Sequence, residues 1–397
     1  MESTGNSSFS SSSSSSNDFV TYLSETVKEY KTKSPLSITD STSDNKGHIY
    51  KTVFANCHYF MSEEDIKTSF NTYIDDILKE NNFTCCEPWI INQNKVDPAL
   101  IDYLSAIKQP EQKTQAWYLF RHDHITASNA WKALGTQATK NQLIYEKCIP
   151  INIEKYTPTL NENSLTWGHK YEPLSGAIYE FKHKTIIKEF GCIEHPVYTF
   201  LAASPDGIVV GENNYGKMIE IKNVVSRVID GIPKKEYQTQ MQLQMEVCNL
   251  DECDFIETKF IEYDSIHDFM EDSNTNSNIF LTKDNKQKGI ILMFIHESRF
   301  IYKYTPFTIT TMAEVDLWIE ETTKNTSGEW FKNVYWKLDI FSCVLVKRNK
   351  EWFSHAIVLL SELWNTICIE RQSGEFINRA PKKKAKKLLI NTITKLN

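Results

Sequence analysis

The stretch 201–223, with the sequence LAASPDGIVVGENNYGKMIEIKN, most restricts what this chain can fold into. It contains two short apolar runs, 208–210 and 218–221, whose length and composition are those of buried strands. The residues before the first run, SPDG, are a turn sequence, because proline presets one backbone angle and glycine permits a positive φ beside it. We therefore expect neighbouring strands here, with the acidic residue Asp206 at a tight bend just before one of them.

Charged residues on the second strand suggest a metal-dependent site. Glu220 and Lys222 are two residues apart, so the pleat of a strand directs both side chains to the same face. Carboxylates from Asp206 and Glu220, converging with one ammonium, suit a site that holds Mg²⁺ and activates water against a phosphodiester. Each signal is weak alone, because Glu-x-Lys is more often a solvated strand edge and SPDG more often only a turn.

Composition restricts the class of protein. The 397 residues are enough for two or three domains, and 41% hydrophobic and 24% charged residues are typical of a soluble globular protein. The nine cysteines are odd in number, scattered and without C-x-x-C spacing, which favours a reducing compartment. We find no secretory h-region and no apolar run of membrane length, so we predict neither secretion nor a membrane span. The net charge of −7 argues mildly against a general nucleic-acid binder but leaves room for a local basic channel.

The segments before residue 116 carry no chemistry. A serine tract in residues 1–17 cannot bury enough apolar surface to fold, so we expect a disordered tail. Helices are predicted near 63–80, from a capping-box-like start and apolar residues at helical spacing, and from Asp97 to about Lys108, with proline in the first turn.

A candidate phosphate site follows. Arg121 precedes residues 126–128 (TAS), which begin a short helix predicted to end at Gly135. A hydroxyl from Ser128 and free amides at a helix N-terminus, with an arginine nearby, form a natural phosphate cradle. The plainer interpretation is an ordinary helix cap beside a surface arginine.

Two further helices carry polar candidates. Glu172 lies in the expected first turn of a helix that runs to about His183, where it either favours the helix dipole or adds a metal-binding carboxylate. The helix predicted for 234–250 places Tyr237, Gln240 and Gln244 on one face at i, i+3 and i+7. These glutamines are either solvated surface or donors to a nucleophilic water or a phosphate.

The blocks occur in the order R-x4-TAS, G-x3-E, SPDG, E-x-K and Y-x2-Q-x-Q-x2-M. This series resembles the lambda exonuclease / YqaJ-like viral recombinase family of the PD-(D/E)XK nuclease superfamily, over roughly residues 117–264. The resemblance implies an α/β (α+β) fold: a restriction-endonuclease-like core whose central mixed sheet is flanked by helices, with helical N- and C-terminal additions.

The resemblance also implies a role for each site residue. Arg121 and Ser128 would bind the 5′ phosphate of the strand being degraded. Lys222 would orient the nucleophilic water and stabilise the transition state, and Gln240 would help to order that water. The implied ligands of two divalent ions, Mg²⁺ with Mn²⁺ as a substitute, are Glu172, Asp206, Glu220 and the backbone carbonyl of Ile221.

Elementary chemistry agrees with this assignment. Two metal ions clamp the attacking and leaving oxygens of an in-line displacement and neutralise the acidic cluster. Without metal, carboxylates so close together repel one another, and one of them is expected to titrate with a raised pKa. Asp206 and Glu220 are therefore expected to act in catalysis together with Lys222 and Gln240. No cysteine quartet accompanies Cys248 and Cys253, so no iron–sulfur cluster is predicted.

The expected organisation is a disordered tail (1–17), a mostly helical region (18–115), the nuclease core (116–305), a helical aromatic-rich region (306–380) and a basic tail (381–397). Further strands are expected in the core at 255–261, 290–295 and 300–304. The basic run near residue 381 either tracks DNA, acts as a nuclear address or is a solvated tail.

We therefore predict a Mg²⁺-dependent deoxyribonuclease that digests duplex ends from the 5′ side during viral DNA recombination, repair or defence. The alternatives are a structure-selective endonuclease, a single-strand nuclease of the same fold, or a non-catalytic module that binds DNA ends. The expected partners are double-stranded DNA ends, a single-strand annealing protein and further copies of the chain in a dimer or trimer. The expected location is a reducing interior: the host cytoplasm or a viral replication site for a viral chain.

Overall fold

A computed structural model describes residues 19–28, 49–50, 53, 63–80, 96–112, 114–152, 160, 164–275 and 278–381. The predicted tail 1–17 and all but the first residue of the predicted basic tail lie outside these ranges. The helices are α3 (Glu63–Glu80), α4 (Pro98–Ala106), α5 (Gln115–His122), α6 (Ala127–Ala130), α7 (Gln137–Cys148), α8 (Ser164–His183), α9 (Lys235–Cys248), α10 (Ile266–Glu271), α11 (Met312–Asn325), α12 (Lys350–Ser373) and the 3-10 helix η2 (Glu375–Arg379).

The strands form three sheets, of which the largest has seven strands in the order β11-β10-β12-β7-β6-β5-β2. A three-stranded sheet, β1-β4-β3, and a β8-β9 pair complete them. The strands are β1 (Ile125–Thr126), β2 (Ile187–Lys188), β3 (Ile193–Glu194), β4 (Leu201–Ala203), β5 (Gly207–Val209), β6 (Met218–Asn223), β7 (Glu252–Glu262), β8 (Ser273–Thr275), β9 (Asn278–Thr282), β10 (Lys288–His296), β11 (Arg299–Tyr304) and β12 (Glu329–Lys347).

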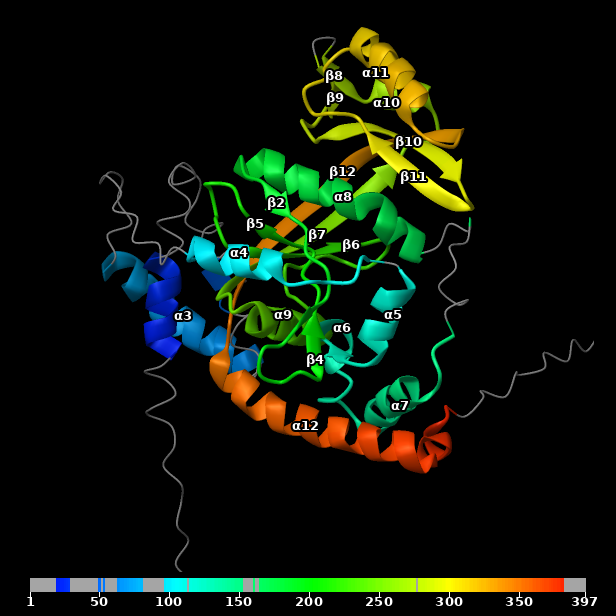
Figure 1. The fold of residues 1–397 in the computed structure, drawn as a ribbon. Coiled ribbons are helices and arrows are strands. Elements are labelled where there is room, and N and C mark those ends of the chain that lie inside the picture. The colour runs from blue at the N-terminus through cyan, green and yellow to red at the C-terminus, as the bar shows by residue number, and fades with distance from the viewer. Residues whose placement is uncertain are drawn as a thin grey trace, which may run out of the picture.

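The seven-stranded sheet is mixed, as predicted. Strands β6 and β7 run parallel, whereas the other neighbours in this sheet are antiparallel. Helix α9 provides the crossover that a parallel pair requires. Helix α8 lies against one side of this sheet, and α9 with α6 and α12 lies on the other (Figure 1). The predicted class, a central mixed sheet flanked by helices, is confirmed.

Alternation along β6 decides which side chains meet which helix layer. Ile219 and Ile221 pack in one cluster with Tyr179 of α8, whereas Met218 packs with Met241 of α9 in the main core. Residues 220 and 222 share the parity of Met218, so their side chains face the α9 layer.

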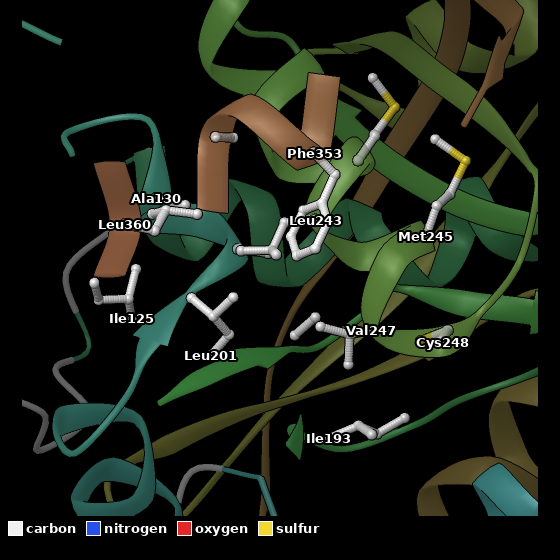
Figure 2. Close-up of a cluster of buried hydrophobic side chains, with 14 of the residues drawn as sticks. Ile125, Ala130, Ile193, Leu201, Leu243, Met245, Val247, Cys248, Phe353 and Leu360 are labelled. Atoms are coloured by element: carbon white, nitrogen blue, oxygen red, sulfur yellow. The ribbon is translucent and has the colours of Figure 1, made fainter. Parts of the chain in front are cut away.

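The main core joins parts of the chain that are far apart in sequence. Figure 2 shows Leu201 of β4, Leu243 of α9, and Phe353 and Leu360 of α12 in one cluster of buried side chains. Cys248 and Cys253 are fully buried in the same core. The C-terminal helix is therefore built into the core that supports the site.

The N-terminal helix α3 behaves as its periodicity predicts. Ile66, Phe70, Ile74 and Ile77 are buried in a separate small cluster with apolar residues of 19–27. Helix α4 also matches its prediction, since the Asp97 side chain caps it through a 2.9 Å bond from the amide of Ala99.

The predicted helical character of 306–380 is wrong in its middle. Residues 329–347 form β12, which pairs with both β10 and β7 near the centre of the large sheet. Its sequence, EWFKNVYWKLDIFSCVLVK, is rich in aromatic and β-branched residues that suit a pleated surface. The aromatic residues alone are compatible with a helix, whereas the alternating burial along much of the segment is that of a strand. Sheet and helical additions therefore share the C-terminal third of the chain.

Two local expectations around the site also need correction. Gly207 is not among the residues with positive φ; instead a Cβ there would overlap the Ile187 side chain of β2, so close packing of the strands requires the glycine. Helix α8 begins at Ser164, and Glu172 therefore lies in its interior rather than in its first turn.

Helix α12 satisfies the length and composition criteria for a membrane-crossing helix, which by themselves are weak evidence, and it is the one such helix among the described residues. A third of its most apolar window is buried inside the protein.

Candidate active site

The turn before β5 ties Asp206 to the neighbouring strand. The backbone amide of Ile221 donates a 2.7 Å hydrogen bond to Oδ2 of Asp206. Strand β5 pairs with β6 only at Ile219 and Met218, so β6 extends beyond the pairing and its amide is available to the aspartate. The N–H and C=O of one strand residue point to the same side. The carbonyl of Ile221 therefore faces the side on which Asp206 lies.

Glu220 is the buried centre of the site. Its side chain is 0% exposed, and three side chains donate to its carboxylate. Lys222 and Gln240 both donate to Oε1, Gln240 at 2.7 Å. Gln244 donates to Oε2 at 2.7 Å and to the carbonyl of Ser204 at 3.0 Å. A buried carboxylate held by several donors is fixed in one orientation.

Gln244 was not among the predicted site residues, although its helical face was noted. The i, i+4 spacing from Gln240 puts both amides on the side of α9 that faces β6. That spacing, together with the position of α9 directly after the Glu-x-Lys strand, was the available signal. Tyr237 of the same face packs its ring 5.1 Å from the Lys222 ammonium.

The electrostatics match the expected repulsion between carboxylates. Burial, and then the charge of Glu220, raise the pKa of Asp206 well above its usual range; Lys222 opposes this shift and Glu172 adds to it. Burial alone would lower the pKa of Lys222, but the charges of Glu220 and Asp206 outweigh it and raise the pKa. The lysine therefore stays protonated beside two acidic groups at neutral pH.

Glu172 approaches from the other helix layer. Helix α8 packs on β6 through Ser175, whose hydroxyl donates to Asn223 at 2.7 Å, and through Gly176, where an added Cβ would lie 3.9 Å from the Ile221 side chain. The Glu172 side chain is exposed, and its charge reaches Asp206 strongly enough to raise the pKa of that carboxyl. It therefore lies at the rim of the site rather than in its buried centre.

The donor set fits a divalent cation. Asp206, Glu220, Glu172 and the carbonyl of Ile221 are all oxygen donors, which Mg²⁺ and similar hard ions prefer. Burial, and then the charge of Glu220, raise the pKa of Asp206, so the charged form of this carboxyl is disfavoured without a further positive charge. A bound cation would supply that charge.

A buried polar atom beside the carboxylates also points to an additional partner. The amide oxygen Oε1 of Gln244 has no hydrogen-bond partner among the described residues. Buried polar groups are nearly always satisfied by protein, water or ligand. The same amide group donates to Glu220, so its unsatisfied oxygen fits a site that holds an ion with its waters.

Arg121 and Ser128 are brought together as predicted. The guanidinium donates a 3.0 Å hydrogen bond to the Ser128 hydroxyl and lies 4.6 Å from the ring centroid of Trp117. The expected helix to Gly135 is much shorter, because α6 ends at Ala130. The candidate phosphate cradle therefore consists of the arginine and the hydroxyl, without the dipole of a long helix.

Side chains of α7 and α12 fix the backbone around Arg121. The buried ammonium of Lys147 on α7 donates a 2.5 Å hydrogen bond to the backbone carbonyl of Arg121. Arg371 of α12 donates hydrogen bonds to the backbone carbonyls of His122, at 3.1 Å, and Lys147, at 2.9 Å. Burial, helped by the charges of Arg121 and Arg371, lowers the pKa of Lys147 to about 7. His124 is structural, since its ring contacts the carbonyl of Phe120 and the Glu194 carboxylate.

The two parts of the site are connected through Cys192. Burial raises the pKa of its thiol, and the Arg121 guanidinium and the Ser204 side chain oppose that rise, so both lie beside the sulfur. Ser204 is in turn held by Gln244, which binds Glu220. A continuous set of contacts therefore runs from the candidate phosphate cradle to the acidic centre.

The chain is similar to a viral protein and to several solved structures. The chain is 28% identical over 353 residues, 80% of its length, to an uncharacterized protein of Acanthamoeba polyphaga mimivirus, and it spans 61% of that relative. Among solved structures it is similar to an alkaline exonuclease from Laribacter hongkongensis (20% identity, TM-score 0.39, 67% of this chain and 98% of that chain). It is also similar to a phage-related exonuclease from Haemophilus somnus (13% identity, TM-score 0.33, 64% of this chain and 96% of that chain).

A family match covers the part of the chain that contains the acidic centre and the Arg121–Ser128 pair. The matched stretch, 116–251, includes every predicted site residue and ends just after α9. The family indicated by the order of the motifs is thereby confirmed: residues 116–251 match the YqaJ-like viral recombinase domain.

Proposed function

We propose that the protein is a metal-dependent DNA exonuclease that hydrolyses the 5′-ended strand at duplex ends. The observation that carries this proposal is the buried Glu220 carboxylate, held by Lys222, Gln240 and Gln244 next to a second carboxylate with a raised pKa. A protein that only binds DNA gains nothing from a buried acidic centre, because such a centre repels phosphates and is costly to desolvate. The family match supports the same reaction class.

Divalent ions would be held by Asp206, Glu220, the Ile221 carbonyl and, from the rim, Glu172. When bound, such ions polarise a phosphoryl oxygen and lower the pKa of a coordinated water towards neutrality. We infer that Mg²⁺ is the working ion and that Mn²⁺ substitutes for it.

The chain's own residues position the reactants. Lys222 remains protonated, so its ammonium orients an attacking water and stabilises the negative charge that develops on the phosphoryl oxygens. Gln240 and Gln244 keep Glu220 in one orientation, so that the carboxylate is not reorganised during the reaction. Electrostatic groups fixed in advance in this way supply a large part of the rate enhancement in phosphoryl transfer.

End recognition is assigned to Arg121 and Ser128. A terminal 5′ phosphate carries more charge than an internal diester, so an arginine beside a hydroxyl discriminates in favour of an end. The Trp117 ring below the guanidinium keeps it in place. This pair favours an exonuclease that acts from the 5′ side, leaving 3′ single strands.

The test is digestion of linear duplex DNA that has a 5′ phosphate at one end and a 5′ hydroxyl at the other. Reactions contain Mg²⁺ or EDTA and compare the wild type with Lys222→Met and Arg121→Ala. We expect metal-dependent shortening from the phosphorylated end, none with Lys222→Met, and a preference for that end reduced by about 10-fold or more with Arg121→Ala, as expected for loss of a charge-assisted bond.

Other outcomes identify the alternatives. Metal-dependent nicking of closed circular DNA would replace the exonuclease by an endonuclease, and digestion of single strands alone would indicate a single-strand nuclease. Binding of ends without any cleavage in Mg²⁺ or Mn²⁺ would leave only an end-binding module. Lys140→Met on α7 serves as the control lysine-to-methionine variant, outside the site.

The wider context is also proposed. The resulting 3′ single strands would be passed to a single-strand annealing protein during viral recombination, repair or defence. A dimer or trimer is expected, and the scattered cysteines favour the reducing host cytoplasm or a viral replication site. The six cysteines in the described ranges are free thiols.

A further inference from the structure

A cleft lies between the C-terminal end of α8, which belongs to the matched domain, and the β9–β12 part of the chain, which lies outside it. It has a volume of about 400 Å³, within the range of small-ligand sites. Phe181 and Lys182 line it from α8, Phe307 and Lys286 from the segments around β10, and Phe341 and Asp339 from β12. The lining therefore comes from the C-terminal end of α8 and from the β9–β12 part of the chain; Figure 1 labels these elements.

The cleft presents an exposed aromatic surface. The Phe181 ring is 58% exposed, although it packs against Phe307 with 5.1 Å between ring centroids. The Lys182 ammonium lies 5.2 Å from the ring centroid of Phe341. Rings that remain accessible beside a lysine suit a ligand with a flat apolar face and a negative charge.

The local charge is opposite to that of the whole chain. The one acidic residue lining the cleft, Asp339, is already paired with Lys286 at 3.0 Å and with Lys259 at 3.6 Å. Lys182 adds a further positive charge to the lining. These side chains carry a net positive charge in a chain whose net charge is −7. A local excess of positive charge on an acidic protein indicates a polyanionic partner.

We propose that this cleft binds single-stranded DNA, with a base stacked on Phe181 and phosphates beside Lys182 and Lys286. A single strand fits better than a duplex, because only unpaired bases offer their faces to an aromatic side chain. Accessible rings and a backbone-tracking positive charge together are the combination that single-strand binders use.

The position of the cleft suits the strand that digestion leaves behind, and this part of the inference rests on the proposed function. Glu172, at the rim of the acidic centre, and Phe181 are on the same helix, separated along its axis by ~14 Å at 1.5 Å per residue. Helix α8 thus connects the two sites. A single strand held at the cleft stays near the site without entering it.

The test measures binding of a 5′-hydroxyl oligothymidylate by fluorescence anisotropy, in EDTA so that no strand is cut. Phe181→Ala is expected to weaken binding by at least about 5-fold, the loss of one base–aromatic stack. Lys182→Glu is expected to weaken binding and to reduce the slope of log affinity against log salt by about 1. A blunt duplex is expected to lose much less affinity in both variants.

Each control variant makes the same kind of substitution as a cleft variant, at a position outside the cleft. Phe331→Ala removes a ring that is 46% exposed and is not part of the cleft, and Lys324→Glu reverses a lysine on the surface of α11. Cleft variants that bind the single strand within 2-fold of these controls would overturn the proposal. A loss confined to the duplex would overturn the assignment to single strands.

The result is independent of catalysis. A wild type that digests duplex ends while the cleft variants bind like the controls would overturn the cleft and leave the exonuclease intact. Loss of binding in a protein that cuts nothing would retain the cleft and overturn the exonuclease. Cross-linking of a 4-thiothymidine oligonucleotide to the wild type checks the site without any substitution, because the cross-linked peptide must contain residues 181–182 or the neighbouring lining segments.

Discussion

The side-chain amide of Gln244 donates a 2.7 Å hydrogen bond to Oε2 of Glu220 and a 3.0 Å bond to the carbonyl of Ser204. One glutamine on α9 thereby joins the carboxylate on β6 to the turn that carries Asp206. Asp206 lies in the turn before β5 and Glu220 lies on β6, and these two strands pair over only two residues. Gln244 therefore fixes a geometry that the short pairing does not fix alone.

Replacing Gln244 with methionine tests this role. The substitution keeps the approximate volume but removes the donor, so Glu220 keeps its charge and loses its orientation on one side. We expect turnover to fall about 10- to 100-fold, the range for residues that orient metal ligands, with little change in the affinity for DNA. Nuclease kinetics in saturating Mg²⁺ and anisotropy with DNA ends in EDTA separate these two effects.

The matched control is Gln142→Met on α7. Gln142 makes the same kind of contact, a 2.7 Å bond to Glu146, on the protein surface. Full activity in this variant and in Gln244→Met alike would show that Gln244 has no role in orientation.

Asp206 should make the metal-free protein less stable at neutral pH. A carboxyl whose pKa is raised in the folded state contributes stability below the pKa of the unfolded chain, about 4, and loses it as pH rises through the folded value. We expect Asp206→Asn to raise Tm in EDTA at pH 7 by roughly 2 °C or more, and the gain to vanish near pH 4. Asparagine retains an oxygen that can accept from Ile221.

Bound metal should reverse the order of thermal stability of the wild type and Asp206→Asn. Mg²⁺ or Mn²⁺ is expected to raise the Tm of the wild type and to leave Asp206→Asn nearly unchanged, since the variant lacks one ligand charge. Asp316→Asn, an exposed carboxylate on α11, is the control and should respond to metal like the wild type. Equal metal-induced shifts in Asp206→Asn and the wild type would exclude Asp206 as a ligand.

The buried side chain of Lys147 predicts a second pH dependence of the free energy of unfolding. Burial lowers its pKa to about 7, so between pH 7 and about 10.4 the folded state binds fewer protons than the unfolded chain, and stability rises with pH. In Lys147→Met this contribution is absent. We expect the free energy of unfolding of the wild type, relative to the variant, to increase between pH 7 and pH 9.5.

Urea unfolding at the two pH values measures this difference, and Lys140→Met on the same helix is the control. Other groups titrate equally in both proteins and cancel in the comparison. A difference between wild type and Lys147→Met that is constant from pH 7 to pH 9.5 would contradict the lowered pKa.

The sequence predicted that Asp206, Glu220, Lys222 and Gln240 lie together, and they do so because the determinants are local; their roles in catalysis and metal binding stay predictions. Glu220 and Lys222 are on one strand, Asp206 is at a turn signalled by SPDG, and Gln240 follows on the next helix. Each position depends on strand or helix periodicity over a few residues. The general class of the fold followed from the same motifs.

What the sequence did not reveal depends on contacts between distant segments. The place of β12 between β10 and β7 is set by pairing over long separations, which the aromatic pattern of 329–347 does not encode by itself. The packing of Gly207 against Ile187 and the support of the Arg121 backbone by Arg371 are likewise tertiary. Such contacts override local propensity.

Helix α12 gives the strongest test that the C-terminal region is part of the core that supports the candidate site. Leu360 is fully buried in the main cluster, so Leu360→Ala should lower the free energy of unfolding by about 2–5 kcal/mol. Its neighbour Leu359 is 41% exposed, and Leu359→Ala should change stability by no more than about 0.5 kcal/mol. Urea unfolding followed by intrinsic tryptophan fluorescence measures both.

A single transition that shifts for Leu360→Ala, with nuclease activity lost at the same urea concentration, is the expected result, because α12 and the site share one core. Nuclease activity that persists after α12 has unfolded would instead show that the helix is a dispensable addition.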